Sequence, residues 1–232
     1  VKFWPDMRLY PLLTLVLPLL TACVMTAPSH VAQKYCSLTV KGGVEAEREI
    51  KKILASDLRS LWDIAMAYNE DWAENNPGDK PPFGDGIPIQ AFPDAAPDCK
   101  VGKMIGDGEA PHTVDVTHRF LDQEGGWTDR LILTPEKGSW VISDIVFAPE
   151  YTSSLRQILV DTEITDFLDD REGCEHFRGE EPYDAERAAF LKKNIEELCP
   201  DIDKRLDDLQ AKYWDNPVIL QKLTGLERLE GP

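Results

Sequence analysis

Three stretches between residues 112 and 147 decide the fold of this chain. They read HTVDVTHRFL (112–121), WTDRLILT (127–134) and SWVISDIVF (139–147). Each is rich in β-branched or aromatic residues that alternate with polar ones, which is typical of strands with one buried face. Glycines at 125–126 and at 138 separate the three stretches and indicate tight turns. The pattern therefore predicts an antiparallel meander.

The segments on either side of these strands have helical periodicity. Apolar residues recur every three or four positions through residues 29–75, with a glycine pair at 42–43 where one helix is expected to end. Residues 155–167 predict a further helix that leaves the sheet. Helices followed by antiparallel strands indicate an α+β fold, with N-terminal helices packed on a curved antiparallel sheet.

Several of these residues also resemble a known family. V-x-V-x-x-x-F (114–120), the glycine-bounded hairpin, SWVISDI (139–145) and SLRQIL (154–159) are similar to a bacterial family of exported proteins. The resemblance covers roughly residues 29–160 and implies the nuclear-transport-factor-2-like fold, a cone of helices on a curved sheet. The family has no assigned general function, so the resemblance implies no activity.

The N-terminal segment indicates where the protein is located. An apolar run at 9–20 follows Met7-Arg8 and ends in Leu20-Thr21-Ala22-Cys23, which resembles the bacterial lipobox. We expect residues 1–22 to be a lipoprotein signal peptide, Cys23 to be lipidated and residues 23–28 to form a tether to the membrane. By resemblance to enterobacterial lipoprotein sorting, Val24 at the next position favours the outer membrane, with the protein facing the periplasm. An ordinary signal peptide followed by a chance cysteine remains the alternative.

Four cysteines remain once Cys23 is assigned to the lipid. An even number in an exported chain predicts disulfides, and the simplest pairing is Cys36–Cys99 and Cys174–Cys199. The chain-entropy model gives about 4 and about 3.5 kcal/mol of stabilisation for these two loops. A metal site formed by Cys174, His176 and Cys199 is the weaker alternative, because no Cys-x-x-Cys pair supports it.

The charge of the chain constrains its partners. The net charge is −17, with 42 acidic against 25 basic residues, which disfavours nucleic-acid binding and favours a basic partner protein. Residues 161–232 hold 20 acidic and 10 basic side chains, net −10, whereas residues 1–160 hold 22 and 15, net −7. This shift predicts a boundary near residue 160, between an α+β domain (29–160) and an acidic helical module (161–232). The module is expected to contain a helical hairpin stapled by the second disulfide, with one helix that begins after Asp184 as its N-cap and another that begins at Pro200-Asp201.

Two polar residues on the predicted strands are candidates for a pocket. His118 and Asp144 are expected on the concave face of the sheet, lined by Trp140 and Phe120. The resemblance implies a role for them, because in enzymes with this fold a carboxylate or histidine in the concavity acts as a general base. The alternative is structural, with His118 in the core and Asp144 accepting a hydrogen bond. No nucleophile elbow, metal-ligand spacing or phosphate-binding loop is found, so no catalytic residue, metal or cofactor is assigned.

Two functions follow from these observations. The first is a non-catalytic, membrane-anchored interaction protein of the cell envelope, such as an inhibitor or immunity-type protein for a basic partner. The second is a small-ligand-binding or enzymatic protein that uses the concavity near His118 and Asp144. The acidic surface and the lack of a catalytic set favour the first.

Overall fold

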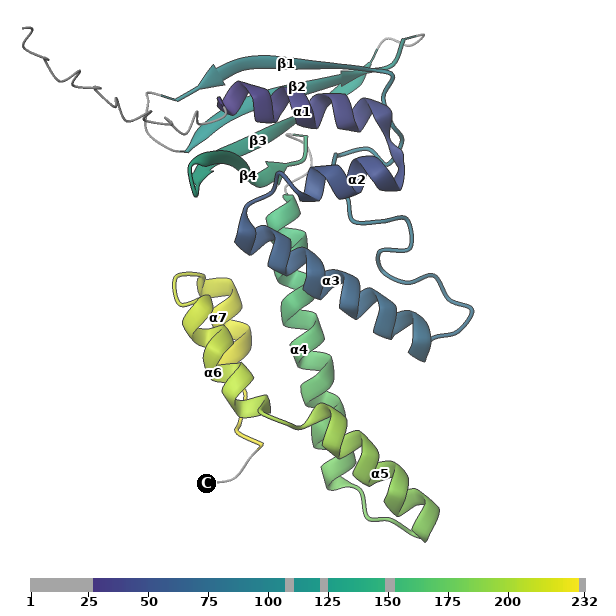
Figure 1. The fold of residues 1–232 in the computed structure, drawn as a ribbon. Coiled ribbons are helices and arrows are strands. Elements are labelled where there is room, and N and C mark those ends of the chain that lie inside the picture. Colours follow the sequence, from purple (N-terminus) through teal and green to yellow (C-terminus); the bar gives the residue numbers. More distant parts are fainter. Residues whose placement is uncertain (1–26, 107–110, 122–124, 149–152, 230–232) are drawn as a thin grey trace, which may run out of the picture.

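A computed structural model describes residues 27–106, 111–121, 125–148 and 153–229 (Figure 1). The elements, in chain order, are α1 (Pro28–Lys41), α2 (Gly43–Lys51), α3 (Ser56–Asn75), β1 (Asp98–Ile105), β2 (His112–Arg119), β3 (Gly126–Glu136), β4 (Ser139–Val146), α4 (Leu155–Gly179), α5 (Ala185–Leu198), α6 (Ile202–Lys212) and α7 (Pro217–Thr224). The fold is α+β, as the sequence predicts.

The strands form one antiparallel sheet in the order β1-β2-β3-β4. The meander of β2, β3 and β4 was expected, whereas β1 was not. The pairing of β1 with β2 shifts between Val101 and Met104, so β1 lacks a clean alternation that would reveal it in the sequence. At the opposite edge, the segment before α3 adds to β4, because the backbone N–H groups of Ala55 and Ile142 donate to the carbonyl groups of Ile142 and Ile53, each at 2.8 Å.

Helix α1 covers one face of the sheet, called the inner face below (Figure 1). The core contains inner-face residues of the strands, such as Val114, Val116, Leu131 and Leu133, none of which is exposed. A disulfide between Cys36 on α1 and Cys99 on β1 links the helix to the sheet, which confirms the first predicted pairing.

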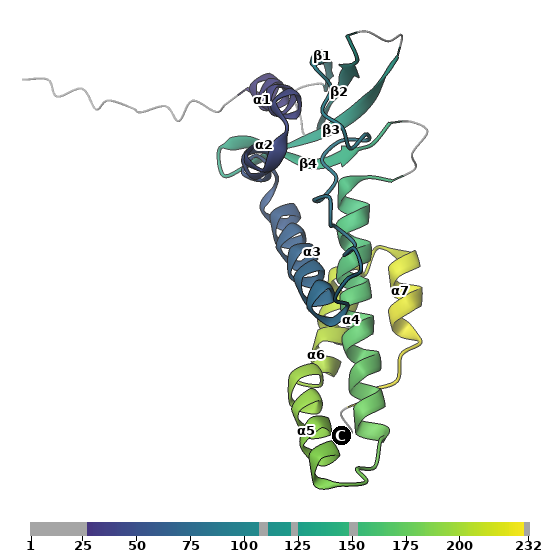
Figure 2. The same ribbon diagram turned by 90° about the vertical axis from the view of Figure 1, so that its right-hand side faces the viewer.

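Helix α4 carries the chain away from the sheet (Figures 1 and 2). It begins at Leu155, where the Ser154 hydroxyl accepts a hydrogen bond from the N–H of Gln157 at 3.2 Å, and ends only at Gly179. Its 25 residues span about 37 Å at 1.5 Å per residue. The helix predicted for 155–167 was therefore too short, and residue 160 lies inside α4.

The second disulfide joins Cys174 on α4 to Cys199 at the end of α5. This confirms the predicted pairing, but the stapled hairpin consists of α4 and α5, whereas the sequence suggested α5 and α6. Gly173 lies inside α4, where a glycine weakens the helical pattern of the sequence. A Cβ at Gly173 would lie 2.7 Å from Cδ1 of Leu198, so the glycine lets α5 approach α4 closely.

Helix α5 begins at the predicted cap. The Asp184 carboxylate accepts a hydrogen bond from the N–H of Arg187 at 2.7 Å, which satisfies a free donor in the first turn. The helices α6 and α7 then return along α4, and their buried residues, Ile202, Leu206, Leu209, Ile219 and Leu223, belong to the same apolar cluster as the residues under α1. None of the described helices is both long enough and apolar enough to cross a membrane.

Candidate functional site

A histidine and a carboxylate are buried together at the inner face of the sheet. His118 on β2 and Asp129 on β3 have no exposed side-chain surface, and Nε2 of His118 lies 3.6 Å from Oδ2 of Asp129. The Trp127 indole stacks on the His118 ring with centroids 4.8 Å apart, and the Tyr35 ring of α1 meets it edge-on at 6.3 Å. Strand register produces the cluster, because Trp127 pairs with His118 and Asp129 lies two residues further along the same face.

Backbone and indole N–H groups hold the buried carboxylate. Asp129 accepts hydrogen bonds from Trp127 Nε1 at 3.1 Å, from the N–H of Ala91 at 3.2 Å and from the N–H of Ala148 at 3.3 Å. Burial raises the pKa of Asp129 to about 6, and these hydrogen bonds oppose the rise. Burial lowers the pKa of His118 to about 4. At neutral pH the cluster therefore holds an ionised carboxylate beside a neutral imidazole.

The cluster lacks the access that a catalytic site needs. A general base must come within hydrogen-bond distance of its substrate, directly or through one water. Trp127 covers the His118 ring, and Phe92 and Phe120 contact Trp127 in turn with ring centroids 5.5 and 5.6 Å away. Neither ring nitrogen of His118 makes a hydrogen bond with the described residues. The geometry therefore fits a structural core better than a reaction site.

Asp144 lies on the opposite face of the sheet from His118. Across the β3–β4 pairing, Ile142 is opposite Leu133 whereas Asp144 is opposite Ile132, so β4 advances two residues while β3 advances one. This bulge reverses the alternation and turns Asp144 to the outer face. The prediction that Asp144 shares one face of the sheet with His118 was wrong for this reason.

The Asp144 carboxylate has a structural role at the start of α4. It accepts hydrogen bonds from the N–H of Arg156 at 2.9 Å and from the N–H of Ile145 at 2.8 Å. The Arg156 guanidinium donates to the Ser143 carbonyl at 2.7 Å and to Asp57 of α3 at 2.8 Å. These contacts tie β4, α4 and α3 together, which matches the structural alternative given for Asp144.

The other two predicted pocket residues are separated along the sheet. Trp140 contacts His112 edge-on with ring centroids 4.5 Å apart, whereas Phe120 contacts Trp127. His112 and Phe120 flank the two ends of β2. The structure therefore brings Phe120 close to the stack over His118, and it does not gather all four predicted residues around one pocket.

Sequence reasoning missed Asp129 and Tyr35 as members of the buried cluster. The signal for Asp129 was present in the alternation of β3: Leu131 and Leu133 face the core, and two and four residues earlier the same face carries Asp129 and Trp127. A carboxylate on the apolar face of a strand is the informative observation, because carboxylates are rarely buried without hydrogen-bond or ion-pair partners.

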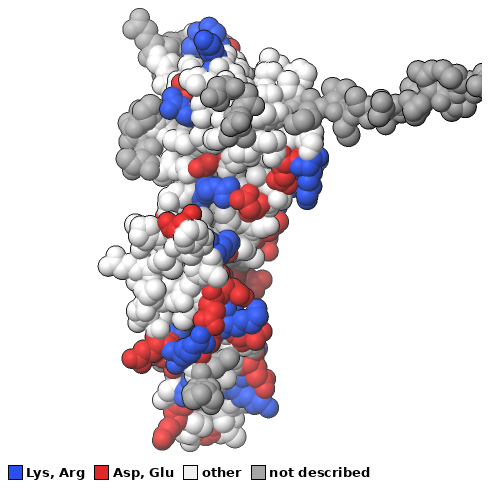
Figure 3. All heavy atoms as spheres, turned by 90° about the vertical axis from the view of Figure 1, so that its left-hand side faces the viewer, with Lys and Arg blue, Asp and Glu red and all other residues white. Residues whose placement is uncertain are grey.

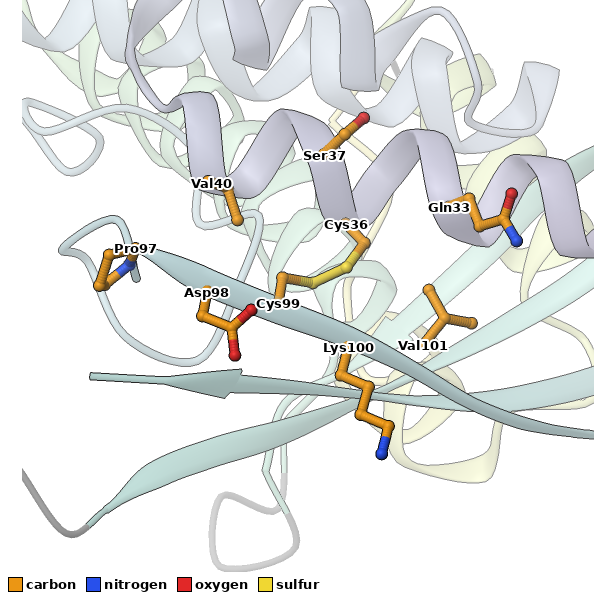
Figure 4. A pocket seen from close by; sticks show the side chains of 9 residues that line it. All are labelled: Gln33, Cys36, Ser37, Val40, Pro97, Asp98, Cys99, Lys100 and Val101. Carbon is orange, nitrogen blue, oxygen red and sulfur yellow. A yellow bond between two sulfur atoms is a disulfide. The ribbon is translucent and has the colours of Figure 1, made fainter. Parts of the chain in front are cut away.

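A groove runs between α1 and β1 over the first disulfide (Figure 4). It has a volume of about 560 Å³ and is open along one side. Gln33, Ser37 and Val40 line it from α1, and residues 97–101 line it from the strand side. The groove has polar and apolar lining residues in similar measure and lies beside the free edge of β1.

A second hollow, of about 680 Å³, lies between α3, α4 and the turn that joins α6 to α7. Its cations are already paired, since Arg156 bonds to Asp57 at 2.8 Å and Lys212 bonds to Glu163 at 2.7 Å. The Tyr213 hydroxyl also donates to Glu163. The cations of this hollow are therefore paired within it, and of its described carboxylates Asp215 has no ion pair.

The helical part of the molecule carries carboxylates that lack ion-pair partners. Figure 3 shows acidic and basic side chains interspersed on one face of these helices, so the acidity is spread along them. Exposed carboxylates on and beside α4, α5 and α6 that have no ion pair with any described residue are Asp169, Glu172, Glu175, Glu181, Asp184, Glu186, Glu197, Asp201 and Asp215. Of these, Asp169 and Asp184 accept hydrogen bonds from Tyr68 and from the N–H of Arg187. We call α4, α5 and α6 the acidic arm.

The sequence also suggested an alternative metal site and a lipidation site. Cys174 and Cys199 form a disulfide, which removes both thiolates from the alternative metal site with His176. In the described part of the chain, no group of three or more His, Cys, Asp or Glu side chains could hold a metal ion. Cys23 and the signal segment lie outside the described residues.

No protein family, curated protein or solved structure matches this chain.

Proposed function

We propose that this chain is a non-catalytic binding protein of the bacterial cell envelope. In this proposal, Cys23 carries a lipid anchor, the protein faces the periplasm from the outer membrane, and its partner is a basic envelope protein whose activity it inhibits. The proposed fold is the nuclear-transport-factor-2-like cone, supported by α1 and α2 preceding an antiparallel sheet that α1 covers.

The acidic arm is the observation that carries the proposal. Its unpaired carboxylates lie on α4 and α5 and in the turns beside the helices of the arm, and α4 is fixed to α5 by the Cys174–Cys199 disulfide. Fixed charges lose little conformational entropy on binding, and a surface of one sign speeds the encounter with a partner of the other sign. An arm that projects from the sheet domain is accessible to a protein partner (Figure 2).

The filled inner face supports a binding role over an enzymatic one. His118 and Asp129 are buried beneath Trp127, and Asp144 accepts a hydrogen bond from the N–H of Arg156 at the start of α4. The pocket alternative needs His118 and Asp144 on one face, and the strand register separates them.

Binding of purified chain to a basic envelope hydrolase tests the proposal. The probe is immobilised egg-white lysozyme, with serum albumin as an acidic reference surface, and the full chain carries Cys23→Ser to prevent lipidation. We expect association with the basic surface that weakens steeply between about 50 and 500 mM salt, because screening shortens the range of the charges. Inhibition of cell-wall hydrolysis by lysozyme is measured in parallel.

A charge-matched pair of variants locates the interaction. The triple variant Glu172→Gln, Glu175→Gln and Glu186→Gln removes three unpaired charges from the acidic arm. Its control, Glu70→Gln, Glu74→Gln and Asp79→Asn, removes three exposed charges from the end of α3 and the loop after it. Loss of affinity in the arm variant alone supports the proposal. Equal losses, or no salt-dependent binding, contradict it.

A further inference from the structure

The outer edge of β1 is the free edge of the sheet. At the opposite edge, Leu54 forms a bridge with Ile142 of β4, and backbone hydrogen bonds close that side. Within the described ranges, no residue pairs with the outer side of β1. A free strand edge presents unpaired N–H and C=O groups that can accept another strand.

The groove of Figure 4 lies directly beside this edge. Gln33 and Ser37 of α1 form its polar wall, and the Cys36–Cys99 disulfide lies across its floor. Because the disulfide fixes α1 relative to β1, the groove exists before any ligand enters. A preformed groove lowers the ordering cost of binding.

The β1 edge is basic although the chain as a whole has a net charge of −17. Lys100 and Lys103 are exposed, and neither has a carboxylate within 4 Å among the described residues. Lys100 pairs across the strands with Thr117, which places it on the outer face. Asp98, two residues earlier on that face, is already bound by Arg119 at 2.9 Å.

We propose that the β1 edge binds an extended acidic peptide as an additional strand. Residues 98–101 pair with the peptide backbone, a carboxylate of the peptide lies opposite Lys100, and small side chains on its other face enter the groove beside α1. Directly opposite residues on neighbouring strands interact strongly enough for a single ion pair to select the ligand. The shift in register after Val101 ends the regular part of the edge and limits the length of the added strand. The site does not depend on the acidic arm or on its basic partner.

Two labelled heptapeptides test this site on the full chain with Cys23→Ser. Both consist of threonine and serine, one with a central glutamate and the other with a central lysine, and binding is followed by fluorescence anisotropy. We expect the glutamate peptide to bind about fivefold more tightly, which is the upper range for one cross-strand ion pair. In Lys100→Glu the preference should reverse. Lys193→Glu, an exposed and unpaired lysine on α5, should leave it unchanged.

Amide hydrogen exchange locates the bound peptide. Protection of residues 98–101 by the glutamate peptide supports strand addition to β1. Protection elsewhere, equal affinities for the two peptides, no detectable binding, or a preference that Lys100→Glu does not change would overturn the proposal. A dimer in sedimentation that Lys100→Glu dissociates would also overturn it, because a second copy of the chain would then occupy the edge.

Discussion

Nε2 of His118 lies 3.6 Å from Oδ2 of Asp129, and the two side chains share a site with no exposed surface. Burial acts on them in opposite directions, because it disfavours the charged form of each. The pKa of Asp129 is raised to about 6 and that of His118 is lowered to about 4. Two acid–base groups in contact thus titrate in the reverse of their usual order, and the stability of the core should depend on both.

The first prediction concerns stability against pH. The folded state holds the Asp129 proton up to about pH 6, so this group adds stability at low pH that is lost as pH rises from about 4 to 6. His118 acts oppositely, since the unfolded chain takes up its proton near pH 6.5 and the folded chain only near pH 4. The two contributions, each of about 3 kcal/mol, nearly cancel in the native chain.

Single substitutions should separate the two contributions. In Asp129→Asn the His118 contribution remains, so the free energy of unfolding should fall by about 3 kcal/mol from pH 6.5 to pH 4 relative to the native chain. In His118→Gln the Asp129 contribution remains, so the free energy of unfolding should rise as pH falls from 6 to 4. Urea unfolding at a series of pH values measures both. Parallel curves for the two variants would contradict the buried pair.

The second prediction concerns the hydroxyl group of Tyr35. This side chain is fully buried, and its hydroxyl donates to the carbonyl of Ile89 at 2.6 Å. Tyr35→Phe removes the donor and leaves a partly buried carbonyl unpaired, so we expect a loss of about 1–2 kcal/mol in the free energy of unfolding. Tyr183→Phe is the control, because Tyr183 is 80% exposed and should change stability by less than about 0.5 kcal/mol. Equal effects of the two substitutions would argue against this hydrogen bond.

The third prediction concerns a close backbone contact at the start of β3. A Cβ on Gly126 would lie 2.0 Å from the carbonyl oxygen of His118, which is backbone and cannot rotate away. Gly126→Ala should therefore push β2 and β3 apart and cost at least about 2 kcal/mol. Gly225→Ala, with no atom within 4 Å of the added Cβ, should be neutral or slightly stabilising. Thermal unfolding of both variants checks this, and a neutral Gly126→Ala would refute the contact.

The sequence predicted the parts of the fold in which one local pattern persists. The strands β2 and β3 alternate without interruption, so their faces follow from Val114, Val116, Leu131 and Leu133. The disulfides followed from an even cysteine count and from the simplest pairing. In each case, the signal lay in the residue types and their spacing.

The errors arose where long-range packing overrides a local pattern. A bulge in β4 cannot be read from residue types, and it alone turns Asp144 away from the inner face. Gly173 resembles a helix break until Leu198 is known to pack against it. Asp129 looks like a surface residue until the N–H groups of Ala91 and Ala148, far away in the sequence, supply its partners. The candidate site was therefore only partly predictable.

The fourth prediction separates the two disulfides. Cys174→Ser with Cys199→Ser opens a loop with a sequence separation of 25, and the entropy model gives a loss of about 3.5 kcal/mol. Cys36→Ser with Cys99→Ser opens one of 63, for which the model gives about 4 kcal/mol. The losses are similar, but the regions that become less stable differ. Without the Cys174–Cys199 bridge, amide exchange should accelerate in α5, and without the Cys36–Cys99 bridge, it should accelerate in α1 and β1. If either pair of substitutions accelerated exchange equally in all three elements, its bridge would not act as a local staple.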